Sequence, residues 1–127
     1  MNFGCNEQSQ TRQALADKYI AQSLSLLYSD LSHSWSLDNL AKEVGLSRAG
    51  FAKMFKDLVG FSMFDYLTQQ RIQRAKELLR DIRMPLYEVA SNGGYENDLS
   101  FTRTFKKNTD MTPTCYRKNQ KQSIESE

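Results

Sequence analysis

Residues 37–55 read LDNLAKEVGLSRAGFAKMF, and this stretch predicts two short helices joined by a tight turn. Apolar residues recur three and four apart on one face of the first helix: Leu37, Leu40, Ala41 and Val44. Gly45 follows, where glycine can take a positive φ and end that helix without a Cβ clash. Ser47 can then cap the second helix by accepting a backbone N–H. This is the helix-turn-helix arrangement, whose second helix enters the major groove of DNA.

A second copy of the pattern begins at residue 86, and the repeat is the stronger signal because any small helical hairpin can resemble one copy. Leu86, Val89 and Ala90 match the first copy at an offset of 49. Gly94 matches Gly45, after which the turn is one residue longer. The later matches, at an offset of 50, are Phe101, Arg103, Phe105, Lys106 and Tyr116. The chain therefore contains a duplicated helical unit.

The whole chain predicts an all-α fold of about seven helices, with two helix-turn-helix subdomains joined by a long linker helix. The expected domains are a disordered tail at 1–10, a first subdomain at 11–62, the linker helix at 63–82, a second subdomain at 83–118 and a polar tail at 119–127. The linker should be stiff, because no Gly or Pro interrupts it. Its expected inward stripe is Phe64, Leu67, Arg71, Ala75, Leu78 and Ile82. Within that stripe Arg71 is either buried with a carboxylate or extended to a phosphate, and the first is favoured.

Composition suits a globular protein, with 25% charged and 39% hydrophobic residues. The net charge of +2 does not by itself indicate a nucleic-acid partner. The distribution of charge is more informative, because residues 100–121 contain six basic residues and one acidic residue. Between positions 1 and 47, by contrast, three basic residues face five acidic ones. The basic charge therefore lies toward the C-terminal part.

The sequence lacks the residue patterns that several classes of function require. Cys5 and Cys115 share no metal-ligand spacing and His33 is the single histidine, so no zinc set forms and we expect no metal or cofactor. The two distant cysteines favour a reduced, cytoplasmic chain, and with the DNA-binding pattern we expect it to be nucleoid-associated. No apolar run approaches the roughly 20 residues of a membrane span. There is no Gly-rich phosphate loop, Ser/His/Asp grouping or activated carboxylate pair, so we expect no enzyme.

The outward residues of the first recognition helix give the first set of candidate contacts. Arg48 and Lys53 could donate to guanine, whereas Ala49 and Ala52 could touch only a thymine methyl group. The candidate phosphate contacts are Ser47 and Lys56.

The second recognition helix has more polar candidates. The candidate base contacts are Asn97, Asp98, Ser100 and Arg103, and the candidate phosphate contacts are Thr102, Lys106 and Lys107. Arg103 is the best candidate for a bidentate guanine contact, worth about 1–3 kcal/mol of discrimination. Asp98 could accept from cytosine N4 or cap the helix, and the cap is favoured. For any single lysine, a solvated helix face remains the simpler interpretation. Lys53 and Arg103 occupy equivalent places in the two copies, so a DNA contact is favoured for these two residues.

Many of these residues belong to a set with fixed spacing: Leu40, Ala41, Gly45, Ser47, Phe51, Phe55, Lys56, Gly60, Ser62, Tyr66, Leu67, Arg71, Ala75, Leu78, Leu79, Val89, Ala90, Gly94, Tyr95, Phe101, Arg103, Phe105, Lys106, Lys107, Thr112, Pro113, Tyr116 and Arg117. With this set the chain resembles, from about Asp17 to Lys118, the DNA-binding region of the AraC/XylS transcription regulators. The resemblance implies about seven helices in two subdomains. It also implies sequence-specific promoter binding, usually with activation through contact with RNA polymerase.

The chain departs from the family pattern in three ways. Met63 replaces the usual proline and Asp110 the usual glycine, and we expect the fold to survive because aspartate tolerates the left-handed conformation. Ala49, Gly50 and Ala52 are small where relatives often carry larger base-reading side chains, which shifts the expected readout to the second helix. There is no room for an effector-binding domain, so a small stand-alone regulator or a fragment of a larger one is expected.

The leading hypothesis is a transcription activator that binds double-stranded promoter DNA as a monomer. Its two helices would read successive major-groove segments roughly 34 Å apart, with RNA polymerase as partner. One alternative is a protein-interaction module that docks on polymerase or a partner domain, with DNA contact secondary. Another is a DNA-repair methyl acceptor, which would need a reactive-cysteine cluster that Cys5 does not supply.

Overall fold

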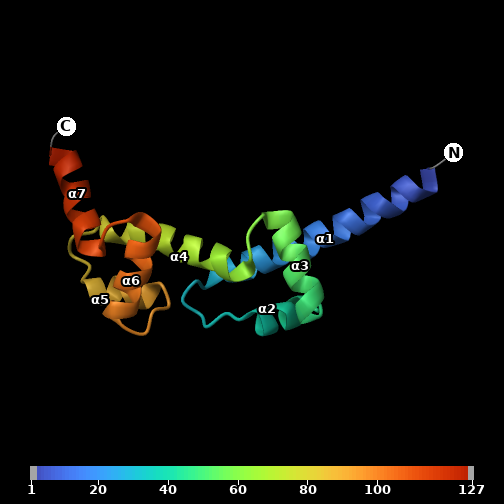
Figure 1. Cartoon of the computed structure of the whole chain (residues 1–127), viewed down its shortest axis with the longest axis horizontal. Helices are drawn as coiled ribbons and strands as arrows, with labels where there is room; N and C mark the ends of the chain where they lie inside the picture. The colour runs from blue at the N-terminus through green and yellow to red at the C-terminus, as the bar shows by residue number, and fades with distance from the viewer. Residues whose placement is uncertain (1–2, 126–127) are drawn as a thin grey trace. The chain divides into compact units, whose positions relative to one another are not determined.

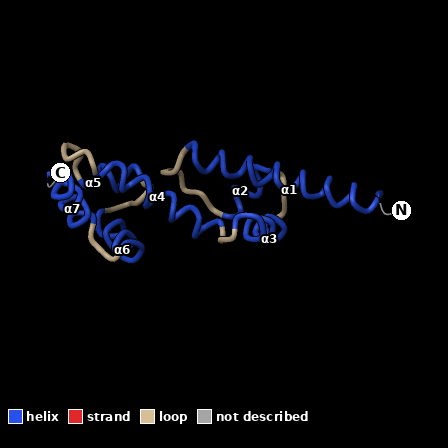
Figure 2. Tube along the Cα trace, turned by 90° about the horizontal axis from the view of Figure 1, so that it is seen from above, coloured by secondary structure: helices blue, strands red, loops and turns tan. Residues whose placement is uncertain are grey.

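The chain folds into helices and loops throughout the range that the structure describes (Figure 1). This computed structural model describes the backbone of residues 3–125 and the side chains of residues 13–120. The helices in this range are α1 (Phe3–Ser29), α2 (Leu37–Val44), α3 (Arg48–Val59), α4 (Met63–Leu79), α5 (Leu86–Asn92), α6 (Asp98–Thr109) and α7 (Pro113–Glu125). The predicted all-α class is confirmed, since no strand occurs among these residues (Figure 2). None of the described helices is both long and apolar enough to cross a bilayer.

The helices form two compact units. The first contains the described residues up to Asp30 together with Trp35–Tyr66, and the second contains Leu31–Ser34 with the described residues from Leu67 onward. The division falls inside α4, which is one continuous helix. Each unit holds one copy of the helix-turn-helix pattern.

In the first unit α1, α2 and α3 pack against one another. The buried side chains are Ile20 and Leu27 from α1, Leu40, Ala41 and Val44 from α2, and Phe51 and Phe55 from α3. Ser23 of α1 is also fully buried, and its hydroxyl donates to the carbonyl of Ile20 at 2.7 Å. The apolar stripe predicted for the first helix of this copy is therefore buried at Leu40, Ala41 and Val44, while Leu37 is half-buried.

The core of the second unit is formed by residues of α4 and of the two helices of the second copy, α5 and α6. Its buried residues are Ile72, Ala75, Leu79, Val89, Ala90, Phe101 and Phe105. The stripe predicted for the linker helix is wrong at its two ends, because Phe64 and Ile82 are 68% and 65% exposed. The helix ends at Leu79, so Ile82 lies in the following loop rather than on a helical face. Leu78 is partly buried against the core, and Ile72 and Leu79 fill the buried positions.

The two ends of the chain are more helical than the sequence predicted. Helix α1 begins at Phe3, whereas disorder was expected over residues 1–10. Helix α7 runs to Glu125, whereas a polar tail was expected over residues 119–127. Neither stretch contains proline, and both are rich in Gln, Glu, Lys or Arg, which are good helix formers. The side chain of Cys5 lies outside the described residues.

Candidate nucleic-acid interface

Both copies make their turn with the same backbone geometry. Gly45 has φ +79° and Gly94 has φ +81°, which is the left-handed region that favours glycine. The next residue then donates its N–H back into the first helix, from Leu46 to Ala41 at 2.9 Å and from Tyr95 to Ala90 at 3.0 Å. Residues matched by the offset of 49 in the sequence therefore make equivalent hydrogen bonds.

A polar side chain caps the start of each recognition helix. The Ser47 hydroxyl accepts from the N–H of Gly50 at 3.2 Å. In the second copy Asn97 Oδ1 accepts from the N–H of Ser100 at 2.8 Å. The hydrogen-bonded cap that the sequence placed at Asp98 is therefore provided by Asn97. Asp98 is the first helical residue, where a carboxylate interacts favourably with the helix dipole.

Three aromatic rings hold each recognition helix on its unit. Phe51 packs edge-on to Phe55 with ring centroids 5.8 Å apart, and Phe55 packs in the same way on Tyr66 at 5.7 Å. The second copy repeats both contacts, at 5.7 Å for Phe101 with Phe105 and 5.6 Å for Phe105 with Tyr116. All four phenylalanines are fully buried. One face of α3 and of α6 is thus fixed inward, and the opposite face is presented to solvent.

The predicted contact residues lie on these outward faces. On α3 and its cap, the exposed residues are Ser47, Arg48, Ala49, Lys53 and Lys56, and Ala52 is half-buried. On α6 and its cap, the exposed residues are Asn97, Asp98, Ser100, Arg103, Lys106 and Lys107, and Thr102 is half-buried. Lys53 and Arg103 each lie midway between two buried phenylalanines, so they point directly away from the core.

Arg48 has a partner within its own unit. Its Nε lies 3.5 Å from Asp38 Oδ1, and the two side chains are 68% and 72% exposed. Exposed pairs of this kind contribute little stability. The Arg48 guanidinium can therefore exchange this carboxylate for an external acceptor at little cost.

Leu99 is an outward residue that the sequence analysis missed. It lies between the cap and Arg103 on α6, and its side chain is 59% exposed. The available signal was the duplication, because an offset of 50 matches Leu99 with Ala49, which had been given a thymine-methyl role. Helical period agrees, because Leu99 lies two residues before the buried Phe101 and four before Arg103, which places it on the outward face of α6.

Small side chains leave hollows on both flanks of α3. One groove of about 540 Å³ is lined by Trp35, Ser36, Leu37, Arg48, Ala52, Lys56, Ser62, Met63 and Phe64. On the other flank a shallower hollow of about 300 Å³ is lined by Gln13, Ala16, Gly50, Lys53, Met54, Asp57 and Leu58. Hollows thus flank α3 on both sides, and the small residues Ala52 and Gly50 line them. The side chains of residues 13–120 contain no cluster suited to a metal ion.

Comparison with known proteins gives the same assignment. The helix-turn-helix domain family matches residues 40–119. The chain belongs to the AraC/XylS family. A Streptomyces antibioticus protein named as an AraC-like transcription regulator is 36% identical over 82% of this chain and 34% of its own length. The chain thus spans about a third of the length of such relatives.

Solved structures agree in fold. A DNA-binding transcriptional dual regulator from Escherichia coli K-12 is 26% identical, with a TM-score of 0.74 over 82% of this chain and 93% of that one. The C-terminal domain of AraT, a response regulator from Geobacillus stearothermophilus, is 26% identical, with a TM-score of 0.77 over 80% of this chain and 84% of that one. The resemblance inferred from the motif residues is confirmed, and the chain contains an AraC-type DNA-binding domain.

The family's usual proline and glycine are replaced without loss of the caps. Asp110 takes φ +65° at the end of α6, and its N–H donates to Lys106 O at 2.8 Å. Gly60 does the same at the end of α3, with φ +93° and a bond of 2.9 Å to Lys56 O. Met63 begins α4 and is 5% exposed, so its side chain packs inward at the place of the proline. The expectation that the fold survives these changes is confirmed.

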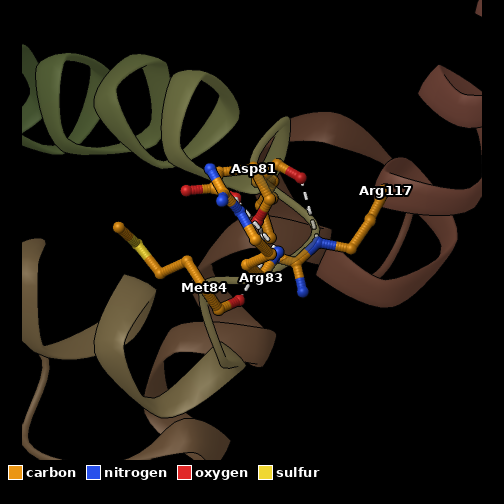
Figure 3. Close-up of polar contacts among 5 residues, drawn as sticks. Asp81, Arg83, Met84 and Arg117 are labelled. Carbon is orange, nitrogen blue, oxygen red and sulfur yellow. Dashed lines mark hydrogen bonds and ion pairs between the residues drawn. The ribbon is translucent and has the colours of Figure 1, made fainter.

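Arg117 of α7 holds the loop that precedes the second copy (Figure 3). Its Nε donates to Leu79 O at 2.9 Å, and one terminal nitrogen donates to Asp81 O at 3.2 Å and Met84 O at 2.8 Å. Carbonyls at the end of a helix have no partner within the helix, and a charged donor satisfies them strongly. Arg117 therefore connects α7 to the end of α4 and to the start of the segment that leads into α5.

Arg71 has a similar structural role in the second unit. The sequence favoured burial with a carboxylate, but its partners are backbone carbonyls: Nε donates to Leu31 O and a terminal nitrogen to His33 O, both at 2.8 Å. Burial lowers the pKa of Arg71, and nearby Tyr95 opposes that shift. Burial likewise raises the pKa of Tyr95, and the charge of Arg71 opposes it. Arg71 is thus a part-buried clamp rather than a phosphate contact.

Proposed function

We propose that this AraC-type domain binds promoter DNA as a monomer, with α3 and α6 inserted in successive major-groove segments. The observation that supports this most directly is the matched pair of outward cations, Lys53 and Arg103. Each stands opposite two buried phenylalanines on a capped helix of the same length. A recognition helix needs this combination, since the buried face fixes its position and the outward face carries the donors.

The proposed site contains two half-sites about one helical turn apart, roughly 34 Å. One chain carries two reading helices, each on its own compact unit, so a dimer is not needed to contact both. The α6 half-site is proposed to carry most of the sequence preference, because its outward residues are longer and more varied in chemistry. The α3 half-site then contributes chiefly affinity through Lys53 and Lys56.

We further propose transcription activation through contact with RNA polymerase. The supporting observation is a relative, 32% identical over 71% of this chain, that is named a transcriptional activator in Escherichia coli K-12. Phe64, which is 68% exposed on the first unit, offers apolar surface for such a contact. Its counterpart in the second copy is Thr114, so Phe64→Thr should lower transcription from the target promoter while DNA affinity stays unchanged. A matching loss of DNA affinity would instead place Phe64 at the DNA.

Selection of duplexes from a random pool, followed by mobility shifts at rising salt, tests the DNA-binding proposal. The expected result is an enriched asymmetric sequence of about two turns, bound with an affinity that falls steeply with salt. Lys106→Ala should reduce the salt slope by about one, because one phosphate contact is lost. Lys18→Ala is the control, since Lys18 is an exposed cation of α1 and belongs to neither recognition helix. Binding without any enriched sequence would contradict the proposal.

A further inference from the structure

We infer that Leu99 is a specificity-determining residue that reads the 5-methyl group of a thymine close to the base pair contacted by Arg103. The inference rests on the proposed function, because it requires α6 in the major groove. It adds a base preference that the polar residues of α6 do not supply.

The exposure of Leu99 is the first observation. It is 59% exposed, whereas the apolar residues that anchor α6, Phe101 and Phe105, are fully buried. The remaining outward residues of the helix are polar or charged. Leu99 therefore contributes nothing to the core of its unit, and the helix leaves a large apolar side chain in water.

The place of Leu99 in the helix is the second observation. It is the second residue of α6, directly after Asp98, and the Asn97 cap fixes this first turn. In helix-turn-helix proteins the N-terminal residues of the recognition helix contact base edges. Leu99 thus lies in the part of α6 that approaches bases rather than phosphates.

The spacing to Arg103 defines which base Leu99 can reach. Residues four apart on a helix share one face, and their positions differ by about 6 Å along the axis. This rise corresponds to about two base-pair steps of B-DNA, at roughly 3.4 Å per step. If Arg103 donates to a guanine, Leu99 therefore reaches a base pair within about two steps of it.

Only thymine offers an apolar group in the major groove, because its C5-methyl projects there while the other bases show donors and acceptors. A leucine side chain gains from covering that methyl group and gains nothing from a polar base edge. The first copy carries Ala49 at the equivalent position, whose single methyl group reaches less far. We therefore expect a thymine preference in the α6 half-site that is weaker or absent in the α3 half-site.

Replacement of single thymines by deoxyuridine in the selected duplex tests the inference, since it removes one methyl group and keeps the hydrogen-bonding edge. Wild-type protein should lose about fourfold in affinity at one thymine near the Arg103 guanine, which corresponds to one buried methyl group at about 0.8 kcal/mol. Leu99→Ala should lose at least that factor on the natural duplex and show no further loss on the deoxyuridine duplex. Ala49→Gly is the matched control, and because it keeps Leu99 it should lose the same factor as wild type on the deoxyuridine duplex.

Three outcomes overturn the inference. Wild-type affinity that is unchanged by every deoxyuridine excludes a methyl contact. A Leu99→Ala protein that still loses about fourfold between the natural and the deoxyuridine duplex would show that another group contacts the methyl and that the effect of Leu99 is indirect. Unchanged DNA affinity in Leu99→Ala would point to a protein partner for this side chain. In each case a preference that Arg103→Ala abolishes would leave the proposed function standing. Absence of any sequence preference in the wild type would overturn both.

Discussion

The two helix-turn-helix copies agree in their interiors and differ on their surfaces. Both use a left-handed glycine at the turn, an N-capping side chain and a ladder of three aromatic rings with nearly equal spacings. Their outward residues have diverged in size and charge: α3 carries Ala49, Gly50 and Ala52, and α6 carries Leu99, Ser100 and Thr102. The difference teaches that packing constrains the buried face of a duplicated unit, while the exposed face is free to acquire its own ligand preference.

Charge divergence follows the same outward faces. Asp57 near the end of α3 corresponds to Lys107 in α6, so the second copy presents one more cation and one fewer carboxylate. Near the start of the helices the order is reversed, with Arg48 in the first copy and Asp98 in the second. The cations of α3 and α6 therefore lie at different positions along the two helices. We do not expect the two half-sites to contribute equally to DNA affinity.

The largest effects should come from the shared aromatic ladder. Phe55→Ala and Phe105→Ala should each lower the free energy of unfolding by about 3–5 kcal/mol, because both rings are fully buried. Urea denaturation followed by circular dichroism measures the loss. Trp35, the single tryptophan, belongs to the first unit, so its fluorescence should respond strongly to Phe55→Ala and weakly to Phe105→Ala. A large difference in cost would break the equivalence of the two interiors.

The next largest effect should come from the turn glycines, where the same substitution should cost different amounts of stability in the two copies. A Cβ at Gly45 meets nothing within 4 Å, so Gly45→Ala should cost only the left-handed strain, about 1–2 kcal/mol. A Cβ at Gly94 would lie 2.9 Å from Ser32 O, and a backbone atom cannot yield as a flexible side chain can. Gly94→Ala should therefore cost about 2–5 kcal/mol, through overpacking added to the strain. Thermal unfolding of the two variants checks the order, and equal costs would contradict it.

Base readout should differ more modestly. Arg103→Ala should weaken binding to the selected duplex by about 1–3 kcal/mol and relax the preference at one guanine. Lys53→Ala should weaken binding less and evenly across sequences, because a lysine offers a point charge where arginine offers a fork of donors. Mobility shifts on the selected duplex and on single-base variants distinguish the two. Equal relaxation of preference by both variants would show that α3 reads bases as well as α6 does.

The smallest effect should appear at the helix ends. Asp110→Gly should stabilise the second unit by about 0.5–1 kcal/mol, because Asp110 is held at φ +65° where glycine has no Cβ strain. Gly60→Asp, at the matching place with φ +93°, should destabilise the first unit by a similar amount. Calorimetry measures both shifts. Destabilisation by Asp110→Gly would indicate that the aspartate carboxylate has a further local role.

The sequence predicted what depends on local periodicity and on the duplication. The turns, the cap at Ser47 and the four buried phenylalanines follow from spacing that both copies share. The fold class also followed, since each predicted helix has an apolar face. These features need only neighbours within a few residues along the chain.

Features that depend on distant segments were not predictable in this way. The partners of Arg71 lie 38 and 40 residues away and are backbone carbonyls, which no residue pattern marks. The buried stripe of α4 also shifted, because the helix ends at Leu79 and leaves Ile82 in a loop. The exposure of Leu99 was missed although local spacing predicts it, since Leu99 lies two residues before Phe101 and therefore on the opposite face of α6.

The three bonds of Arg117 connect α7 to the end of α4 and to the loop that leads into α5, and the Tyr116 ring connects it to α6. Any shortened form of the chain that stops ahead of Tyr116 leaves the carbonyls of Leu79, Asp81 and Met84 without this donor, and it removes the Tyr116 ring from Phe105. Proteolytic cleavage early in α7 would therefore disable the second reading helix while the first unit kept its fold. Under the proposed function, such a cut would leave one of the two recognition helices able to contact DNA.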